Sequence, residues 1–211
     1  MRQITLPNWL SRMDKDFKWL SIPKLPLLLV IIQILGFVLV MGKPEFEQRL
    51  VLNPDMVLQG EIWRIFTFVA IPLSHNFLMF FVLWFFYFVM TSLESAWDST
   101  LLTIYFLITW ISIVLASLLI GTSVDTFAYM EFSFFFALAT LNPNRTIHLF
   151  FILPLAFKWI ALFTAIVLFF MPLFLGSYSL KQVLFVSYLV FFGKDYWLRL
   201  KNELDRRKRS V

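Results

Sequence analysis

The chain has 211 residues, of which 60% are apolar, only 15% are charged and 27 are phenylalanine. Soluble domains are closer to half apolar and a quarter charged, so this composition excludes a soluble enzyme or a disordered chain and indicates a polytopic membrane protein. With no cysteine and two histidines, the chain offers no disulfide and no thiolate or histidine-rich metal centre, and we expect no metal or cofactor. The net charge of +5 is better explained by membrane topology than by nucleic-acid binding.

The first segment, residues 1–24, is mixed in character and basic. Apolar residues recur in it at helical spacing, namely Trp9, Leu10, Met13, Phe17 and Leu20. Basic residues lie between them, and this pattern predicts an amphipathic helix in the membrane interface. A cleaved signal peptide is not expected, because the first long apolar run begins only at Leu25 and no small-residue cleavage site follows it.

Residues 25–197 are expected to form one membrane domain of six transmembrane helices, because each crossing needs about 20 apolar residues. The expected helices are 25–41, 76–93, 99–120, 126–141, 157–175 and 180–197. A polar loop of about twenty residues separates the first two helices, and a turn at 94–99 separates the second from the third. Segment 142–156 contains two prolines and is expected to be a loop that dips along the interface. Residues 198–211 form a basic tail.

The distribution of basic residues predicts the topology. With both termini inside, the inner segments hold fourteen Lys and Arg residues and the outer segments hold four. The positive-inside rule therefore places both termini in the cytoplasm and the long first loop outside. Because no retrieval or targeting signal is found, the bacterial cytoplasmic membrane is favoured over the endoplasmic reticulum.

Two polar residues, Glu131 and Ser133, fall inside the expected helix 126–141. Burial of polar groups in a bilayer is costly and usually has a reason. In one interpretation Ser133 is a nucleophile and Glu131 is its ionisable partner. In the other, Ser133 and Ala137 form a small-residue face for helix packing, and Glu131 reaches water near the outer end of the helix.

A serine nucleophile needs an activating base within hydrogen-bond reach. His75 lies at the outer entry to the second expected helix, and His148 lies in the loop after the fourth. Neither histidine falls in the last two helices. A dyad of Ser133 with Lys181 is an alternative, although Lys181 also fits an anchor that snorkels to the outer interface.

The most informative string is LNPDMVLQGEIWRIFT, which ends the first loop. Glu61, Trp63 and Arg64 stand together in it, immediately before an apolar segment. They fit an interface anchor, with the tryptophan in the aromatic belt and the glutamate paired with the arginine. They also fit a structural motif that holds the loop against the bundle.

The string GEIWRIFT resembles the Trp-Arg motif of the rhomboid-like superfamily, which occupies the first loop before the second helix. Glu94, near the end of the second helix, resembles the glutamate of that family at this place. The string NPNRTIHLFFILPLAFKW resembles its proline-basic segment between the fourth and fifth helices. The resemblance covers about residues 50–200. It implies a six-helix rhomboid-like bundle with a long first extracytoplasmic loop.

The departures from that family bear on function. Active rhomboid proteases resemble one another in a Gly-x-Ser-Gly motif in the fourth helix, a His in the sixth, and a His and an Asn in the second. Here Ser133 lies between Phe132 and Phe134, helix 180–197 has no His, and residues 77–89 have neither His nor Asn. The resemblance therefore implies a non-catalytic, derlin-like pseudoprotease that binds transmembrane segments of client proteins without cleaving them. A fourth helix too short to span would thin the bilayer locally and favour helix association.

Three other functions stay open. The chain could be a divergent intramembrane serine protease that uses Ser133, a small transporter or channel, or a subunit whose role is membrane assembly. No internal repeat typical of transporters is found, and only Glu131 is a candidate mid-membrane ionisable group. The expected partners are membrane lipids and client transmembrane helices, and a phenylalanine-rich surface suits either a monomer or an oligomer.

Overall fold

The computed structural model describes residues 16–143, 146–149, 153–157, 159–164 and 166. Its elements are η1 (Lys18–Leu20), α2 (Leu25–Gly42), α3 (Glu45–Leu50), α4 (Pro54–Leu58), α5 (Arg64–Thr67), η2 (Phe68–Ala70), α6 (Leu78–Trp97), α7 (Ser99–Ile120), α8 (Ala128–Leu141), β1 (Thr146–Leu149) and β2 (Leu153–Ala156). The described residues from 157 to 166 are also helical. The fold is thus almost entirely helical.

Three helices in this described part are long and apolar enough to cross a membrane, namely Lys18–Gly42, Leu78–Trp97 and Ser99–Ile120. They suggest an integral membrane protein. Helix α8 is apolar as well, but it has only 14 residues. At 1.5 Å per residue it is about 21 Å long, which is short of the roughly 30 Å hydrocarbon core.

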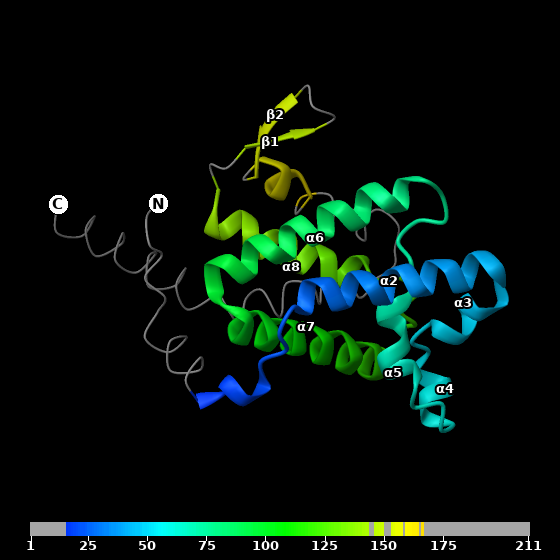
Figure 1. Cartoon of the computed structure of the whole chain (residues 1–211). Helices are drawn as coiled ribbons and strands as arrows, with labels where there is room; N and C mark the ends of the chain where they lie inside the picture. Colours follow the sequence, from blue (N-terminus) through cyan, green and yellow to red (C-terminus); the bar gives the residue numbers. More distant parts are fainter. Residues whose placement is uncertain (1–15, 144–145, 150–152, 158, 165, 167–211) are drawn as a thin grey trace, which may run out of the picture.

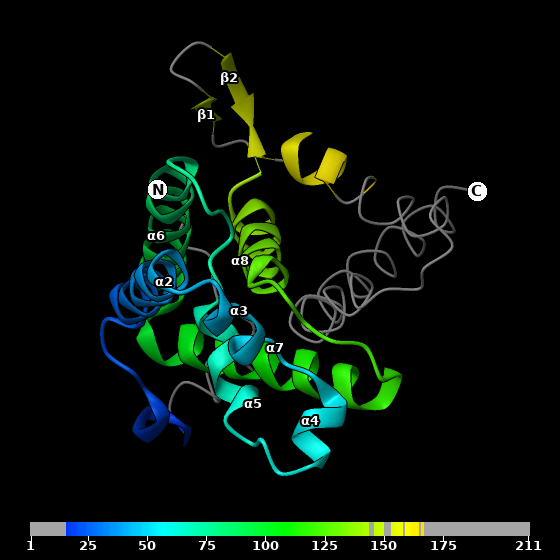
Figure 2. The same ribbon diagram turned by 90° about the vertical axis from the view of Figure 1, so that its right-hand side faces the viewer.

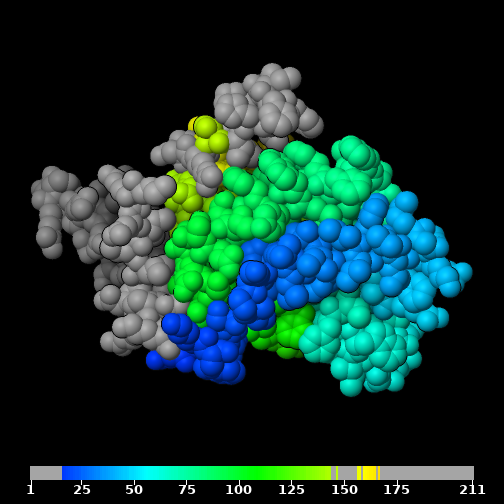
Figure 3. Space-filling model, viewed as in Figure 1, coloured from blue at the N-terminus to red at the C-terminus, as the bar shows by residue number. Residues whose placement is uncertain are grey.

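Helices α2, α6, α7 and α8 form the body of the structure (Figure 1). Helices α2 and α7 run in one direction, and α6 and α8 run in the other. Helix α6 contacts all three of the others. The space-filling view shows α2 lying across one face of the molecule beside α6 (Figure 3). This alternation of direction is the one that successive membrane crossings require.

The outer surface of this bundle is apolar, unlike that of a soluble protein, and a few polar side chains are buried in its largely apolar interior. Gln33, Thr103 and Ser117 are fully buried. The outward faces carry large apolar side chains, among them Leu35, Val38, Phe80, Trp84, Leu115 and Leu119. Lipid is as apolar as these side chains, so exposing them costs nothing there, whereas polar groups gain by bonding inside the bundle.

Aromatic contacts fill the interior where α6, α7 and α8 meet. The ring of Phe86 stands edge-on to Phe127 with centroids 5.4 Å apart, and Tyr105 meets Phe134 at 5.6 Å. These geometries are favoured by the ring quadrupoles. Among the described residues, some phenylalanines therefore build a core, and others, such as Phe77 and Phe80, face outward.

Two expected helices agree closely with the structure. Segment 25–41 is α2 and segment 99–120 is α7, the latter with the same bounds. Gly121 ends α7 with a positive φ of 74°, a conformation in which glycine is unstrained. An uninterrupted apolar run with a clear terminating residue is thus sufficient to place these helices.

The expected helix 76–93 and the turn 94–99 need correction. Helix α6 begins two residues later and continues to Trp97. The turn shrinks to Asp98, whose carboxylate accepts the N–H of Ser99 at 2.8 Å. The hydroxyl of Ser99 donates to Glu94 at 2.7 Å, so these polar residues close a very tight connection rather than forming a loop.

The expected first loop, 43–64, is partly helical. Helices α3, α4 and α5 lie together at one end of the bundle (Figure 2). Asn53 begins α4 because its side chain accepts the N–H groups of Asp55 and Met56. Leu52 and Val124 exchange backbone hydrogen bonds of 3.1 and 2.8 Å, which tie this loop to the α7–α8 connection.

The expected interfacial loop 142–156 contains a β-hairpin instead. Strands β1 and β2 pair antiparallel, with Thr146 opposite Ala156 and His148 opposite Pro154. In a two-stranded sheet both strands are edges, so Pro154 is tolerated although it has no N–H to donate. The prolines had indicated a loop, but they do not prevent this pairing.

Several expected elements lie outside the described residues. These are most of the amphipathic segment 1–24, the second half of helix 157–175, helix 180–197 and the tail 198–211. Helix 126–141 corresponds to α8, which begins two residues later at Ala128.

Candidate functional site

The Trp-Arg string forms a hydrogen-bonded cluster centred on Arg64. Its Nε donates to Oε2 of Glu61 at 2.6 Å. Its Nη1 donates to the carbonyl oxygens of Gln48 and Val51 at 2.7 and 2.9 Å. Gln48 lies in the last turn of α3 and Val51 is its C-cap, where helical partners for the carbonyls run out. The guanidinium group of Arg64 thus connects α3 to α5, and Arg64 is only 8% exposed.

Trp63 behaves differently from Arg64, because its side chain is 53% exposed. It projects from the cluster and suits the aromatic belt of a membrane interface. The two interpretations of this string therefore apply to different residues. Arg64 holds the loop together, and Trp63 has the exposure of an anchor.

A second close contact joins α2 to the segment after α5. Gln33 donates a side-chain hydrogen bond to the carbonyl of Val69. One turn further along, an added Cβ at Gly36 would overlap the carbonyl oxygen of Ala70. Only glycine allows this approach. No sequence pattern had marked Gly36 for this contact.

Ser133 is fully buried between α7 and α8. Its hydroxyl lies 2.7 Å from the hydroxyl of Tyr105, which is also within 3.0 Å of the Ser133 carbonyl oxygen. Ala137, one turn along, is fully buried as well. This arrangement agrees with a packing face and leaves Ser133 without access from the surface.

The histidines do not supply a base for Ser133. The imidazole of His75 is in the connection before α6, where Nε2 is 3.1 Å from Oε1 of Glu47 in α3. Its side chain is 51% exposed, whereas Ser133 is sealed inside. His148 belongs to β1, beyond the opposite end of α8. Lys181 lies outside the described residues.

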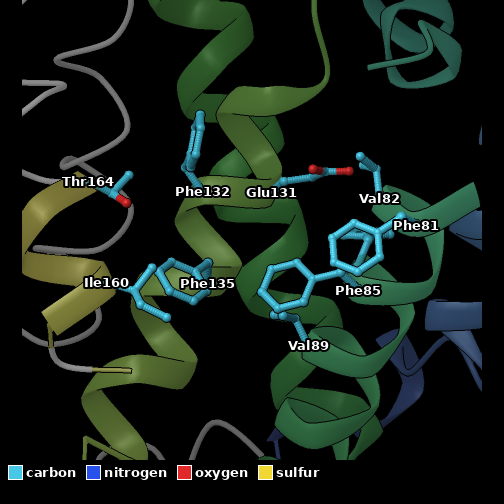
Figure 4. Close-up of a pocket in the computed structure, with 10 residues that line it drawn as sticks. Phe81, Val82, Phe85, Val89, Glu131, Phe132, Phe135, Ile160 and Thr164 are labelled. Carbon is cyan, nitrogen blue, oxygen red and sulfur yellow. The ribbon is translucent and has the colours of Figure 1, made fainter. Parts of the chain in front are cut away.

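A cavity of about 270 Å³ lies between α6, α8 and the helical residues that follow β2 (Figure 4). Its walls are mainly aromatic, with Phe81 and Phe85 from α6 and Phe132 and Phe135 from α8. Phe81 is 44% exposed, so the cavity reaches the surface of the described part of the chain. A concave, mostly apolar space with few polar groups is the usual form of a binding site.

Glu131 is one of two polar residues that line this cavity. It lies in the first turn of α8, and its side chain extends toward Val82 of α6 (Figure 4). Its Oε1 is buried and has no hydrogen-bond partner among the described residues. This oxygen is withdrawn from solvent, whereas Glu131 as a whole is partly exposed.

Sequence reasoning brought Glu131 and Ser133 together, but the structure gives them different surroundings. Glu131 borders the cavity toward α6, and Ser133 bonds Tyr105 of α7. The spacing i, i+2 on a helix indicates this separation, because such residues do not share a face. Tyr105 and the cavity itself were missed, since both depend on how three helices meet. Among residues with described placement, no group of three His, Asp or Glu side chains could hold a metal ion.

Comparison with protein-family models, with curated proteins and with solved structures found no match to this chain. Function is therefore inferred from the geometry of the described residues and from the resemblance of the Trp-Arg string.

Proposed function

We propose that this chain is a rhomboid-like membrane pseudoprotease, which binds transmembrane segments of client proteins without cleaving them. The observation that carries the proposal is the pairing of an accessible apolar cavity with a sealed serine. The cavity beside α8 reaches the surface, while Ser133 is 0% exposed and engaged with Tyr105. Acyl transfer needs a reachable nucleophile, a base and oxyanion donors.

The short α8 supports client binding. Its length of about 21 Å leaves a mismatch of roughly 9 Å with an average hydrocarbon core. A bilayer thins around such a helix, and mismatch of this kind favours association with other helices. The cavity borders this helix, so an arriving segment would meet it where the membrane is thinnest.

The proposed topology is a six-helix bundle with an interfacial N-terminal helix, cytoplasmic termini and an extracytoplasmic first loop, in a bacterial cytoplasmic membrane. The alternating directions of α2, α6, α7 and α8 support it (Figure 1). The chain has no cysteine, so single cysteines give a clean test. In intact cells an impermeant maleimide should label Leu58→Cys, whose parent side chain is 80% exposed, and should not label Ser210→Cys. The reverse labelling would invert the topology.

The catalytic part of the proposal is tested with a fluorophosphonate serine probe on purified protein. We expect no labelling that depends on Ser133, in a sample shown to be folded by its thermal melt. Labelling of the wild type that is lost in Ser133→Ala would establish an activated serine. That result would replace the pseudoprotease with a divergent intramembrane protease.

Client binding is tested by energy transfer in liposomes between labelled protein and a designed polyleucine transmembrane peptide. Val82→Trp should fill the cavity and weaken binding, because Val82 lines it. Leu115→Trp is the matched control, since Leu115 is 53% exposed on α7 and does not line the cavity. An equal loss of peptide binding in both variants, or no peptide binding by the wild type, would contradict the proposal.

A further inference from the structure

The Glu131 cavity has a polar group with nothing to satisfy it. Apart from Glu131 and Thr164, its lining residues are apolar. In the part of the chain that the structure describes, Oε1 of Glu131 is buried without a hydrogen-bond partner. Within the described residues, no Lys, Arg or His side chain lines the cavity. Because an unsatisfied carboxyl oxygen in apolar surroundings is costly, its retention points to a ligand that completes it.

The volume limits what this ligand can be. An engineered cavity of about 150 Å³ holds one benzene, and sites for drug-sized molecules span roughly 300–1,000 Å³. At about 270 Å³ this cavity suits one large side chain better than a whole small-molecule ligand. A side chain delivered from a neighbouring helix fits both the size and the opening beside Phe81.

The walls indicate the chemistry of that side chain. The aromatic rings of Phe81, Phe85 and Phe135 suit an aliphatic stem. The carboxyl group of Glu131, which extends across the space toward Val82, suits a positively charged head that donates hydrogen bonds (Figure 4). Lysine and arginine combine these two parts. Each is costly in a bilayer unless it is paired, so pairing discriminates strongly between client helices.

We propose that the Glu131 cavity receives a basic side chain from the outer half of a client transmembrane helix. This inference rests on the proposed function, since it names the chemistry by which the same cavity selects its clients. The position of Glu131 in the first turn of α8 sets the depth of the basic residue, about one turn from the outer end of the client helix. Clients with an acidic residue at that depth form no such pair and carry the cost of a second carboxyl group in apolar surroundings.

The test uses polyleucine transmembrane peptides that differ at one position, four residues from the outer end. That position carries lysine, norleucine or glutamate. Affinity for the protein in liposomes is measured by energy transfer. The lysine peptide should bind about tenfold more tightly than the norleucine peptide, which corresponds to about 1.4 kcal/mol. The glutamate peptide should bind more weakly than either.

Glu131→Gln keeps the size of the side chain and removes its charge. In this variant the affinities of the lysine and norleucine peptides should differ by less than about twofold. A difference of about tenfold is expected only where the lysine is paired with a charge. Glu45→Gln is the matched control, because Glu45 is exposed on α3 and should keep the tenfold preference. If Glu131→Gln folds poorly by its thermal melt, the three peptides compared on wild-type protein still decide the question.

The outcomes separate this inference from the proposed function. If the lysine and norleucine peptides bind the wild type equally well, the inference is overturned while client binding stands. If no peptide binds, the proposed function itself fails. A third outcome is that the lysine peptide binds more tightly than the norleucine peptide only when Lys181 is replaced in Lys181→Met protein. The carboxyl group of Glu131 would then already be paired with Lys181 in the wild type, and the inference is overturned as well.

Discussion

Replacing Arg64 should destabilise the protein more than replacing any exposed arginine of the same loop. Arg64→Ala removes one ionic hydrogen bond to Glu61 and two bonds to the carbonyls of Gln48 and Val51. A hydrogen bond to a charged group contributes roughly 1.5–3 kcal/mol, and an orphaned buried acceptor costs about 1–3 kcal/mol.

The side chain of Glu61 is 33% exposed, so water replaces part of the hydrogen bonding that Glu61 loses when Arg64 is removed. About 1.5 kcal/mol for the ionic bond and about 1 kcal/mol for each of the two orphaned carbonyls, reduced for the exposure of Glu61, gives a loss of about 3 kcal/mol in the free energy of unfolding. For a chain of this size 1 kcal/mol shifts the melting temperature by about 2–4 °C, so a decrease of about 6–12 °C is expected.

The assay is thermal unfolding in detergent, followed by intrinsic fluorescence. Arg49→Ala is the control, because Arg49 is exposed and its described contact is a cation–π interaction with Phe46 at 5.6 Å. That contact contributes about 0.5–1 kcal/mol. Arg64→Lys should lower the free energy of unfolding about half as much as Arg64→Ala, since the lysine ammonium group cannot reproduce the planar, forked guanidinium group. Equal melting temperatures for Arg64→Ala and Arg49→Ala would refute the role assigned to the cluster.

Two further changes probe the helix contacts. Gly36→Ala should lower stability by about 1–3 kcal/mol, because its methyl group meets the carbonyl of Ala70, whereas Gly42→Ala, with open space around it, should cause no loss in the same melt. Similar melts for the two variants would mean that α2 does not approach this segment closely. Tyr105→Phe should cost about 1–2 kcal/mol by removing the buried hydroxyl that bonds Ser133. Ser133→Ala should lower stability less than Tyr105→Phe in a detergent melt, because the tyrosine hydroxyl still donates to the carbonyl of residue 133. A larger loss for Ser133→Ala than for Tyr105→Phe would contradict this geometry.

Local patterns were sufficient for the long helices. The apolar run of α2 and the run of α7 ending at Gly121 are set by neighbours along the chain, so their bounds could be predicted. The β-hairpin was not predicted, because strand pairing between Thr146 and Ala156 joins residues ten positions apart, and two prolines suggested a loop. Short helices α3 and α4 were also missed, since both lie within a polar stretch and only α4 has a side-chain cap, Asn53.

The sequence by itself determined the class of the protein and the residues worth testing. An apolar composition indicates an integral membrane protein, and polar residues such as Glu131 and Arg64 are conspicuous because burying them in a bilayer costs free energy. What each residue does was decided by tertiary structure alone. Arg64 is buried against carbonyls from α3, Ser133 is sealed against Tyr105, and Glu131 borders a cavity formed by helices distant in sequence. Such contacts depend on packing angles and distances between helices, which no local pattern encodes.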